Sequence, residues 1–531
     1  MTENMKLDDI KALLPEKKIP WLESTEVKVF RGNKEIEGKA KDLIESYSEE
    51  KLWVWPSQTI FFFSDLHGDK DAFKRSLIAT KVVLSNKDRL ELTKEGKKAK
   101  FIIGGDLFDK GPSNLELLDF LKEFIKSGAD VDLIAGNHDI RTFVGIHYMG
   151  VKSLKTSHLF TRVGGKSLTL FKEIYNRYEK ELPNCPYSED ELKEILFPDE
   201  KWLQNFPNFA KNIIHPEKLE KETKRIREKI LEIQEMAQKL ELSLKDIWSC
   251  VIKAREIFLD KKGKYYWVFE KLELAKIYGS FLFVHGGIDD KILPDLFKRG
   301  PSDLKKWFHE KLRKDAFDLY HGEIGNCFRT KYRSYDNNLS QKGIKELHER
   351  GIFAIVHGHL NQRRGQRIVY RENLLHFQCD CSLDINTRKK ENISNLGLAV
   401  TIFRSSGVCE AISSDYDKIK IFKTKGSIED VEKGKKMKKS KRIKFEHESI
   451  EDINSIVKYF ETIISGLKKG SLTFGNNKKT TTLSPSGLIK LKINADNNEK
   501  KAKLGIDLEW REKKVKTEKD DKLIVSDENN N

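Results

Sequence analysis

Five short runs of apolar and β-branched residues recur along the chain, and polar residues follow each run at once. Runs of this length, bounded by glycine or aspartate, predict buried β-strands. We expect strands at residues 59–64, 99–104, 131–135, 281–284 and 353–356.

A cluster of aspartate, asparagine or histidine follows every one of these predicted strands. Taken alone, Asp65-Leu66-His67-Gly68 is more often a loop with a capped turn than a metal site. Open α/β sheets, however, place their ligand sites just past the C-terminal ends of strands, and all five clusters lie there. The other four clusters are Gly105-Asp106-Leu107-Phe108-Asp109-Lys110-Gly111, Gly136-Asn137-His138-Asp139, His285-Gly286-Gly287 and His357-Gly358-His359. Five such clusters together predict one shared metal site.

The residue types in these clusters suit a pair of divalent cations. Two metals roughly 3.5–4 Å apart can share a bridging hydroxide and clamp both oxygens of an in-line displacement at phosphorus. A shared carboxylate and several imidazoles provide ligands for such a pair. Imidazole with carboxylate favours manganese, iron or zinc over the oxygen-rich shell of magnesium or calcium. We therefore expect two transition-metal ions, with manganese preferred over iron or zinc.

A long helical insertion separates Asn137 from His285. Its apolar or small residues follow alternating three- and four-step spacing, which predicts a helix in a hairpin with a coiled-coil-like seam. These residues are Leu219, Ile226, Ile230, Ile233, Ala237, Leu240 and Leu244. An insertion that leaves the rim of the site is expected to form a cap over it, and a remote stabilising bundle is the alternative.

The C-terminal region of the chain has a different pattern. Eight of the twelve residues at 433–444 are lysine or arginine, which indicates a solvated linker that can also attract nucleic acid or acidic partners. Beyond it, apolar spacing predicts a helix at 453–467 and amphipathic strands at 488–493 and 504–510. We expect a small α+β module with one sheet face packed on the helix. The charged, asparagine-rich end predicts disorder.

Composition agrees with a cytoplasmic enzyme of several domains. The chain has 531 residues, a net charge of +16, 38% hydrophobic residues and six cysteines, which do not form a disulfide framework. The N-terminus is polar, and no apolar run approaches the length of a membrane helix. Cys379-Asp380-Cys381 is expected to be a pair of buried thiols. Gly164-Gly165-Lys166-Ser167 looks like a phosphate loop but fails, because Phe160 stands where that motif needs glycine.

The ordered motifs DLHG, GDLFDKG, GNHD, HGG and GH resemble those of the calcineurin-like metallophosphoesterases, and especially their phosphoprotein phosphatase branch and its bacterial relatives. The resemblance covers roughly residues 55–410 apart from the insertion. It implies that Asp65, His67 and Asp106 hold one metal. It also implies that Asp106 bridges to a second metal held by Asn137, His285 and His359. His138 matches the family's acid for the leaving oxygen, and Asp109 the carboxylate that orients it.

Several positions depart from the family pattern. Lys110 stands where the protein phosphatases usually have arginine, so a point charge replaces a planar bidentate clamp. The phosphate-binding candidates are therefore Arg333, Arg141, Lys110 and Asn137, with Arg329 as an alternative to Arg333. Asp139 replaces a glutamate common in eukaryotic members and points to the bacterial side. Asn361 stands where nuclease-type relatives have histidine. His357 is either an extra imidazole at the site or a packed strand residue.

The stretch 446–510 resembles the bacterial amphi-Trp domain, which suggests a docking or oligomerising module. The expected fold is α/β: a metallophosphoesterase β-sandwich flanked by helices, with a helical cap and a small α+β domain. The expected segments are an N-terminal extension (1–50), a first core segment (51–149), the cap (150–278), a second core segment (279–415), a basic linker (416–445), the amphi-Trp-like domain (446–512) and a tail (513–531).

The expected function is hydrolysis of phosphomonoesters on proteins, by attack of a hydroxide that bridges the two metals. Hydrolysis of dinucleoside polyphosphates or other nucleotides is the alternative, because relatives with similar motifs do this. A nucleic-acid-binding scaffold built on the basic linker is disfavoured, since a scaffold has no need of Asp109 and His138. A protein partner is expected at the C-terminal domain, and no membrane partner.

Overall fold

The computed structural model describes residues 10, 13–32, 34–38, 40–86, 89–333, 336, 338–424, 452–476, 479–485, 489–498 and 501–510. The chain divides into two compact units, Met1–Gly434 and Lys435–Asn531. The predicted basic run at 433–444 and the predicted tail at 513–531 lie outside the described residues. Among the helices of the described residues, none is long and apolar enough to cross a membrane.

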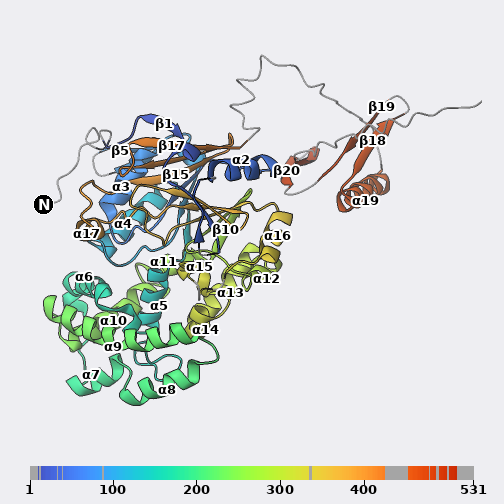
Figure 1. Cartoon of the computed structure of the whole chain (residues 1–531). Coiled ribbons are helices and arrows are strands. Elements are labelled where there is room, and N and C mark those ends of the chain that lie inside the picture. The colour runs from blue at the N-terminus through green and yellow to red at the C-terminus, as the bar shows by residue number, and fades with distance from the viewer. Residues whose placement is uncertain are drawn as a thin grey trace, which may run out of the picture. The chain divides into compact units, whose positions relative to one another are not determined.

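Two mixed β-sheets form the centre of the first unit (Figure 1). The eight-stranded sheet has the order β1 (Lys17–Pro20), β17 (Lys418–Lys423), β16 (Val408–Ser413), β15 (Ala399–Arg404), β4 (Ile60–Phe63), β7 (Lys100–Ile103), β8 (Asp130–Ile134) and β9 (Leu272–Glu273). The seven-stranded sheet has the order β10 (Ala275–Tyr278), β11 (Phe281–Val284), β12 (Ala354–His357), β14 (Leu374–Gln378), β13 (Arg367–Arg371), β2 (Val27–Arg31) and β3 (Lys34–Glu35). The hairpin of β5 (Val83–Asn86) and β6 (Arg89–Leu92) stands apart.

The two sheets pack face to face through aromatic side chains. Phe62 of one sheet lies 5.7 Å from Phe283 of the other between ring centroids, and Phe281 lies 4.9 Å from Phe403. All four side chains are fully buried in one cluster. Offset and edge-on aromatic pairs of this kind stabilise a core beyond their buried area. The predicted α/β sandwich is therefore confirmed.

Helices flank the sandwich, and short polar caps begin many of them. Asp69 accepts from the N–H of Ala72 at the start of α3, and Ser113 accepts from Glu116 at the start of α4, which satisfies backbone donors of the first turn. The flanking helices are α2 (Ala40–Glu50), α3 (Lys70–Ala79), α4 (Asn114–Lys126), α5 (Asn137–Tyr148), α12 (Leu293–Lys298), α13 (Pro301–Lys314), α14 (Ala316–His321), α15 (Gly325–Arg329), α16 (Gln341–Glu349) and α17 (Ile385–Lys390). Two 3-10 helices lie between strands: η1 (Trp21–Glu23) between β1 and β2, and η2 (Gly96–Lys98) between β6 and β7.

The insertion between α5 and β9 is helical, as predicted, and Figure 1 shows its helices gathered on one side of the sheets. Its elements are η3 (Thr161–Val163), η4 (Gly165–Ser167), α6 (Leu168–Tyr178), η5 (Glu179–Glu181), α7 (Glu189–Leu196), α8 (Glu200–Ala210), α9 (Pro216–Lys239), α10 (Leu244–Leu259) and α11 (Tyr266–Lys271).

The predicted insertion helix differs from the observed one in two respects. It ends at Lys239, and Leu244 begins the next helix, because Ser243 caps α10 through a reciprocal pair with Asp246. The buried residues of α9 pack on η3, η4, α6 and α8 rather than forming the predicted coiled-coil seam with one partner helix.

The described residues of the second unit form α19 (Ile453–Lys469), the hairpin β18 (Leu472–Asn476) with β19 (Lys479–Leu483), and the hairpin β20 (Lys490–Asn498) with β21 (Lys501–Glu509). The predicted helix and both predicted strands are confirmed. Both strands extend further towards each other than predicted, because the ladder continues to Asn498 opposite Lys501. The predicted packing of a sheet face on the helix is only partial, since Ile453 stays 81% exposed and Val457 47%.

Candidate metal centre

The five predicted clusters meet where the carboxyl ends of five strands converge. β4, β7 and β8 are parallel neighbours in one sheet, and β11 and β12 are parallel neighbours in the other. Because parallel strands end at the same edge, both sheets direct their clusters to one place. These clusters contribute Asp65, Asp106, Asn137, His285 and His359.

The loops that carry these residues have an uncommon backbone. Asp65, Asp106 and His359 have φ values of 56°, 58° and 65°, in the left-handed region that few non-glycine residues adopt. The loops also approach one another closely. A side chain on Gly136 would collide with Asp106, and one on Gly358 would collide with Asp65. Backbone strain of this kind is typical of functional sites.

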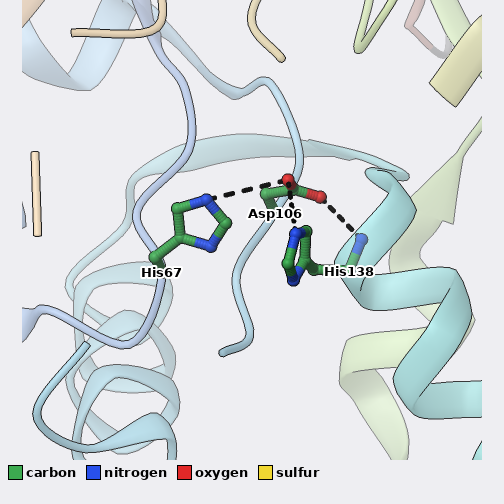
Figure 2. Close-up of side chains that lie close together, drawn as sticks. All are labelled: His67, Asp106 and His138. Atoms are coloured by element: carbon green, nitrogen blue, oxygen red, sulfur yellow. Dashed lines mark hydrogen bonds and ion pairs between the residues drawn. The ribbon is translucent and has the colours of Figure 1, made fainter. Parts of the chain in front are cut away.

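Asp106 lies between two imidazoles in the first half of the site (Figure 2). Its Oδ2 is 3.8 Å from Nε2 of His67 and 3.9 Å from Nε2 of His138. Oδ1 of Asp65 is 3.9 Å from the same nitrogen of His67. These separations leave space for one cation that touches a carboxylate and an imidazole at once.

The other oxygen of Asp106 faces the second half of the site. Oδ1 of Asp106 lies 3.5 Å from Nε2 of His285, and the ligand atoms of Asp106, His285 and His359 lie within 4.8 Å of one another. Asp106 therefore presents one oxygen to each half, as a bridging carboxylate does. Nε2 of His359 is buried without a hydrogen-bond partner, and a bound cation would satisfy such a donor set.

The amide of Asn137 fits this half in two orientations. In one, its oxygen lies 3.3 Å from Nε2 of His285. In the reversed one, its nitrogen donates to Nδ1 of His359 over 2.7 Å and its oxygen accepts from Arg141. A cation selects the first orientation, because only the oxygen can coordinate it.

Hydrogen bonds at the far ring nitrogens hold two of the imidazoles in place. Nδ1 of His67 lies 2.9 Å from the carbonyl oxygen of Phe108, and Nδ1 of His285 lies 2.7 Å from that of Gly104. Donation to a carbonyl fixes the tautomer in which Nε2 carries the free lone pair. Both rings are thus prepared to bind metal through Nε2.

The buried carboxylates favour positive charge here. Burial alone would lower the pKa of His285, but Asp106 and Asp65 raise it to about 10. The donors are oxygens and nitrogens without sulfur, which suits a transition metal. The residues therefore fit the expected pair of divalent ions.

His138 and Asp109 form a separate dyad beside the centre. Nδ1 of His138 lies 2.7 Å from Oδ2 of Asp109, while its Nε2 faces Asp106. Burial alone would raise the pKa of Asp109, but the hydrogen bonds from His138 and Ser167 lower it. Asp109 is thereby kept as an anion that can stabilise a protonated imidazole.

Comparison with known proteins agrees with this geometry. Residues 58–226 match the calcineurin-like phosphoesterase family. The chain carries a calcineurin-like phosphoesterase domain. Residues 437–526 match the Amphi-Trp domain. The chain is therefore a metal-dependent phosphoesterase with a second, C-terminal domain, as the motifs predicted.

Solved structures similar to this phosphoesterase include two phosphatases. One is the cold-active protein-tyrosine phosphatase of a psychrophilic Shewanella species, with 13% identity, a TM-score of 0.36, and coverage of 75% of this chain and 90% of that chain. Another is a protein serine/threonine phosphatase of Saccharomyces cerevisiae with similarity to human phosphatase PP5, with 12% identity, a TM-score of 0.29, and coverage of 72% and 87%. No curated protein sequence matches the chain.

The candidate phosphate-binding residues of the phosphoesterase lie at different distances from its centre. Nζ of Lys110 is 2.6 Å from Nε2 of His67, and Arg141 reaches the amide of Asn137. Arg333 is exposed in the loop after α15 and acts electrostatically on Lys331. Arg329, the alternative, lies over the ring of Tyr320 and beside His321, both on α14. The structure thus brings Lys110 and Arg141 to the metal ligands.

Other residues singled out by the sequence pack elsewhere. The ring of His357 lies against His376, with centroids 5.7 Å apart, and its Nδ1 is 3.0 Å from the carbonyl oxygen of Gly358. It belongs to neither candidate metal group among the described residues. The side chain of Asn361 lies 3.5 Å from Glu391 on the surface. Cys379 and Cys381 are free, buried thiols, as predicted.

Sequence reasoning missed the structural role of Asp139. Its carboxylate accepts from three backbone N–H groups, those of Asp106 (2.9 Å), Leu107 (2.7 Å) and Gly136 (2.8 Å). Burial and Asp106 raise the pKa of Asp139 to about 7, although these hydrogen bonds oppose the rise. Asp139 therefore ties two ligand loops together. The signal was its position three residues after Gly136, where an acidic side chain can turn back to the start of a helix.

Asp380 and Ser167 were also missed as members of the site. Burial and the charges of Asp65 and Asp106 raise the pKa of Asp380, which indicates that it lies beside the metal ligands. Ser167 donates a hydrogen bond to Asp109. Neither is signalled by local sequence, because the contacts join segments far apart in the chain.

Proposed function

We propose that the chain is a phosphatase that hydrolyses phosphomonoesters of phosphoproteins. One observation carries the proposal: the Asp106 carboxylate faces metal-ligating imidazoles with both oxygens, and Nε2 of His138 lies 3.9 Å from that same carboxylate. An acid so close to the metals can reach the leaving oxygen of a phosphate ester bound there.

The proposed roles follow from these positions. Asp65, His67 and Asp106 hold one ion, and Asp106, Asn137, His285 and His359 hold the other. Such ions, manganese first and iron or zinc otherwise, supply an activated water and neutralise charge on the phosphate. His138 donates a proton from Nε2 to the leaving oxygen, and Asp109 holds its Nδ1–H. Lys110, Arg141, Asn137 and Arg333 bind the phosphate oxygens.

A nucleotide with several phosphates is the second candidate substrate, and cations from the insertion favour it. Burial and Arg141 lower the pKa of Lys229 to about 8. Burial and Lys110 lower the pKa of Lys166. Both lysines of the insertion thus lie near cations of the core, and a bound polyphosphate chain would offset the repulsion that lowers their pKa values.

The setting of the enzyme is also proposed. All six cysteines are free, which supports a reducing compartment such as the cytoplasm, and Asp139 supports a bacterial source. The Amphi-Trp domain is proposed to bind a protein partner through the exposed apolar side chains of α19, such as Tyr459 and Phe460.

Activity with manganese tests the proposal. The purified chain is expected to hydrolyse an aryl phosphate when manganese is present. Asp106→Asn and His138→Ala are each expected to lower the rate by at least about 100-fold, with unchanged circular dichroism. Full activity in both variants would contradict the mechanism.

The substrate class is tested on the same preparation. We expect phosphoserine and phosphotyrosine peptides to be hydrolysed faster than a dinucleoside tetraphosphate. An advantage of about tenfold for the nucleotide, equal to about 1.4 kcal/mol in transition-state stabilisation, would select the second candidate.

A further inference from the structure

The insertion reaches the catalytic dyad through a single hydroxyl group. Ser167, at the end of η4, donates to Oδ1 of Asp109, and the other oxygen of that carboxylate lies 2.7 Å from Nδ1 of His138. Ser167 is 1% exposed, so water does not compete for this contact. The carbonyl oxygen of Val163 lies 3.3 Å from the hydroxyl and is a second, more distant acceptor for the same proton.

Close packing fixes the position of η4. A side chain on Gly165 would collide with the backbone carbonyl of Glu232 on α9, and one on Gly164, whose φ is 74°, would collide with Lys229. The two glycines that suggested a phosphate loop in the sequence therefore allow η4 to pack directly on α9. This close packing restricts the movement of Ser167 away from Asp109.

A second contact from the insertion holds Asp109 from its backbone side. Glu173 on α6 accepts from Ser113 Oγ and from the N–H groups of Asn114 and Leu115, each over 2.8 Å, at the start of α4. Oδ1 of Asn114 in turn accepts from the N–H of Asp109 over 2.9 Å. Side chain and backbone of Asp109 are thus both connected to the insertion.

We propose that Ser167 is a positioning residue for the leaving-group acid. Its hydroxyl holds the Asp109 carboxylate in the plane where it accepts Nδ1–H of His138, so that Nε2 points at the leaving oxygen. This inference rests on the proposed role of His138. The insertion then contributes directly to the active site and is not a remote stabilising bundle. Its contribution is the hydrogen bond from Ser167 to Asp109.

Leaving groups of different basicity test this role. A p-nitrophenolate leaves without a proton, whereas a phenolate leaves faster when protonated. Ser167→Ala is expected to lower kcat for phenyl phosphate about tenfold, with KM within about twofold, and to lower kcat for p-nitrophenyl phosphate less than about threefold. An equal loss on both substrates, or no loss on either, would overturn the proposal.

Matched variants separate positioning from general damage. Ser167→Thr keeps the hydroxyl and is expected to restore the rate on phenyl phosphate. Thr169→Ala removes a hydroxyl two residues away, which donates to the carbonyl oxygen of Lys166 over 2.9 Å, and is expected to leave both rates unchanged. In an Asp109→Asn background, Ser167→Ala is expected to add less than about twofold, because the two residues act in one chain of contacts. If the losses in rate from the two substitutions were additive, Ser167 and Asp109 would act independently, and the proposal would be contradicted.

A measurement without turnover distinguishes failure of this inference from failure of the proposed function. In the full chain with histidine-selective nitrogen labelling, the Nδ1–H proton resonance of His138 is expected to shift in Ser167→Ala. It is expected to return towards its original position in Ser167→Thr and to stay in place in Thr169→Ala. An unmoved resonance in Ser167→Ala refutes the positioning role, whether or not the parent chain hydrolyses phosphate esters.

Discussion

At the scale of single residues, the site depends on carboxylates that hold its loops and side chains in place. Asp139 satisfies three backbone donors in two ligand loops, and Asp109 serves His138. Supporting residues of this kind usually contribute about 10- to 100-fold to metal affinity or activity. Both are fully buried, so their loss leaves polar partners without water.

We expect Asp139→Ala to weaken metal binding by at least about tenfold. The reason is that three buried N–H groups lose their acceptor and the loop carrying Asp106 moves. Manganese titration by calorimetry measures the effect. Asp139→Asn keeps one carbonyl oxygen and is expected to lose less. Asp130→Ala, which removes an exposed ion pair with Lys100, is the control and should bind as the parent does. Equal manganese affinity in the parent and all three variants would contradict the role of Asp139 in holding the ligand loops.

The residues that carry metal chemistry could be predicted because their types and order are unusual. Asp106 and His285 were singled out because five such clusters each follow a predicted strand and their order resembles that of a known family. Ser167 could not be predicted, because its partner Asp109 lies 58 residues earlier and the surrounding glycines resembled another motif. Arg333 was favoured for phosphate binding from chain order, whereas the structure places Arg141 against Asn137. Order along a chain does not fix the direction of a long side chain.

At the scale of elements, one carboxylate ties the insertion to the core. Asp119 on α4 accepts from Arg177 on α6 over 2.8 Å, from the hydroxyl of Tyr265 over 2.9 Å and from Lys264 over 2.8 Å. Burial alone would raise the pKa of Asp119, but Lys264, Tyr265 and Arg177 lower it. The charged form therefore contributes to stability.

We expect Asp119→Asn to lower the free energy of unfolding at pH 7 by about 1 kcal/mol, and with it the melting temperature. The effect is small because solvent screens the half-buried Asp119 carboxylate from its partners. A lowered folded-state pKa means that this stability is present above the unfolded pKa of about 3.9. It is lost as pH falls through the folded value. Melting curves of both proteins should thus converge as pH is lowered through the folded-state pKa of Asp119, which lies below its usual value. A constant gap at every pH would exclude this ionic origin.

Elements with a clear period could be predicted, and their partners could not. The strand β4 and the helix α19 match their predicted positions closely. The helix α9 was expected to pair with a single neighbour, but it packs on four elements. Apolar spacing shows which face of a helix is buried, while several partners of similar apolar character can cover that face.

At the scale of the whole phosphoesterase unit, the metal ligands come from both sheets of the sandwich. Asp65, Asp106 and Asn137 follow strands of one sheet, and His285 and His359 follow strands of the other. A ligand that binds only the folded state stabilises it by about 2.7 kcal/mol at 100 times its dissociation constant. Metal at this place would join the two sheets.

Metal removal is therefore expected to lower the melting temperature of the phosphoesterase unit. Scanning calorimetry after chelation and after return of manganese measures the change, and the return should restore it. His285→Ala is expected to lose most of the manganese-dependent increase. His376→Ala, which removes a buried histidine outside the candidate metal groups, should keep that increase. If chelation leaves the melting temperature unchanged, the ions do not link the sheets.

The left-handed backbone at Asp65 and Asp106 restricts the amino acids that these positions can accept. Asparagine and glycine tolerate positive φ, whereas valine, isoleucine and threonine do not. A library covering all substitutions should therefore yield folded protein from asparagine replacements and little from branched ones, independently of catalysis. The same limit guides experimental design: at these two positions asparagine removes the charge while keeping the shape of the loop, so a lost activity reports chemistry rather than a rearranged chain.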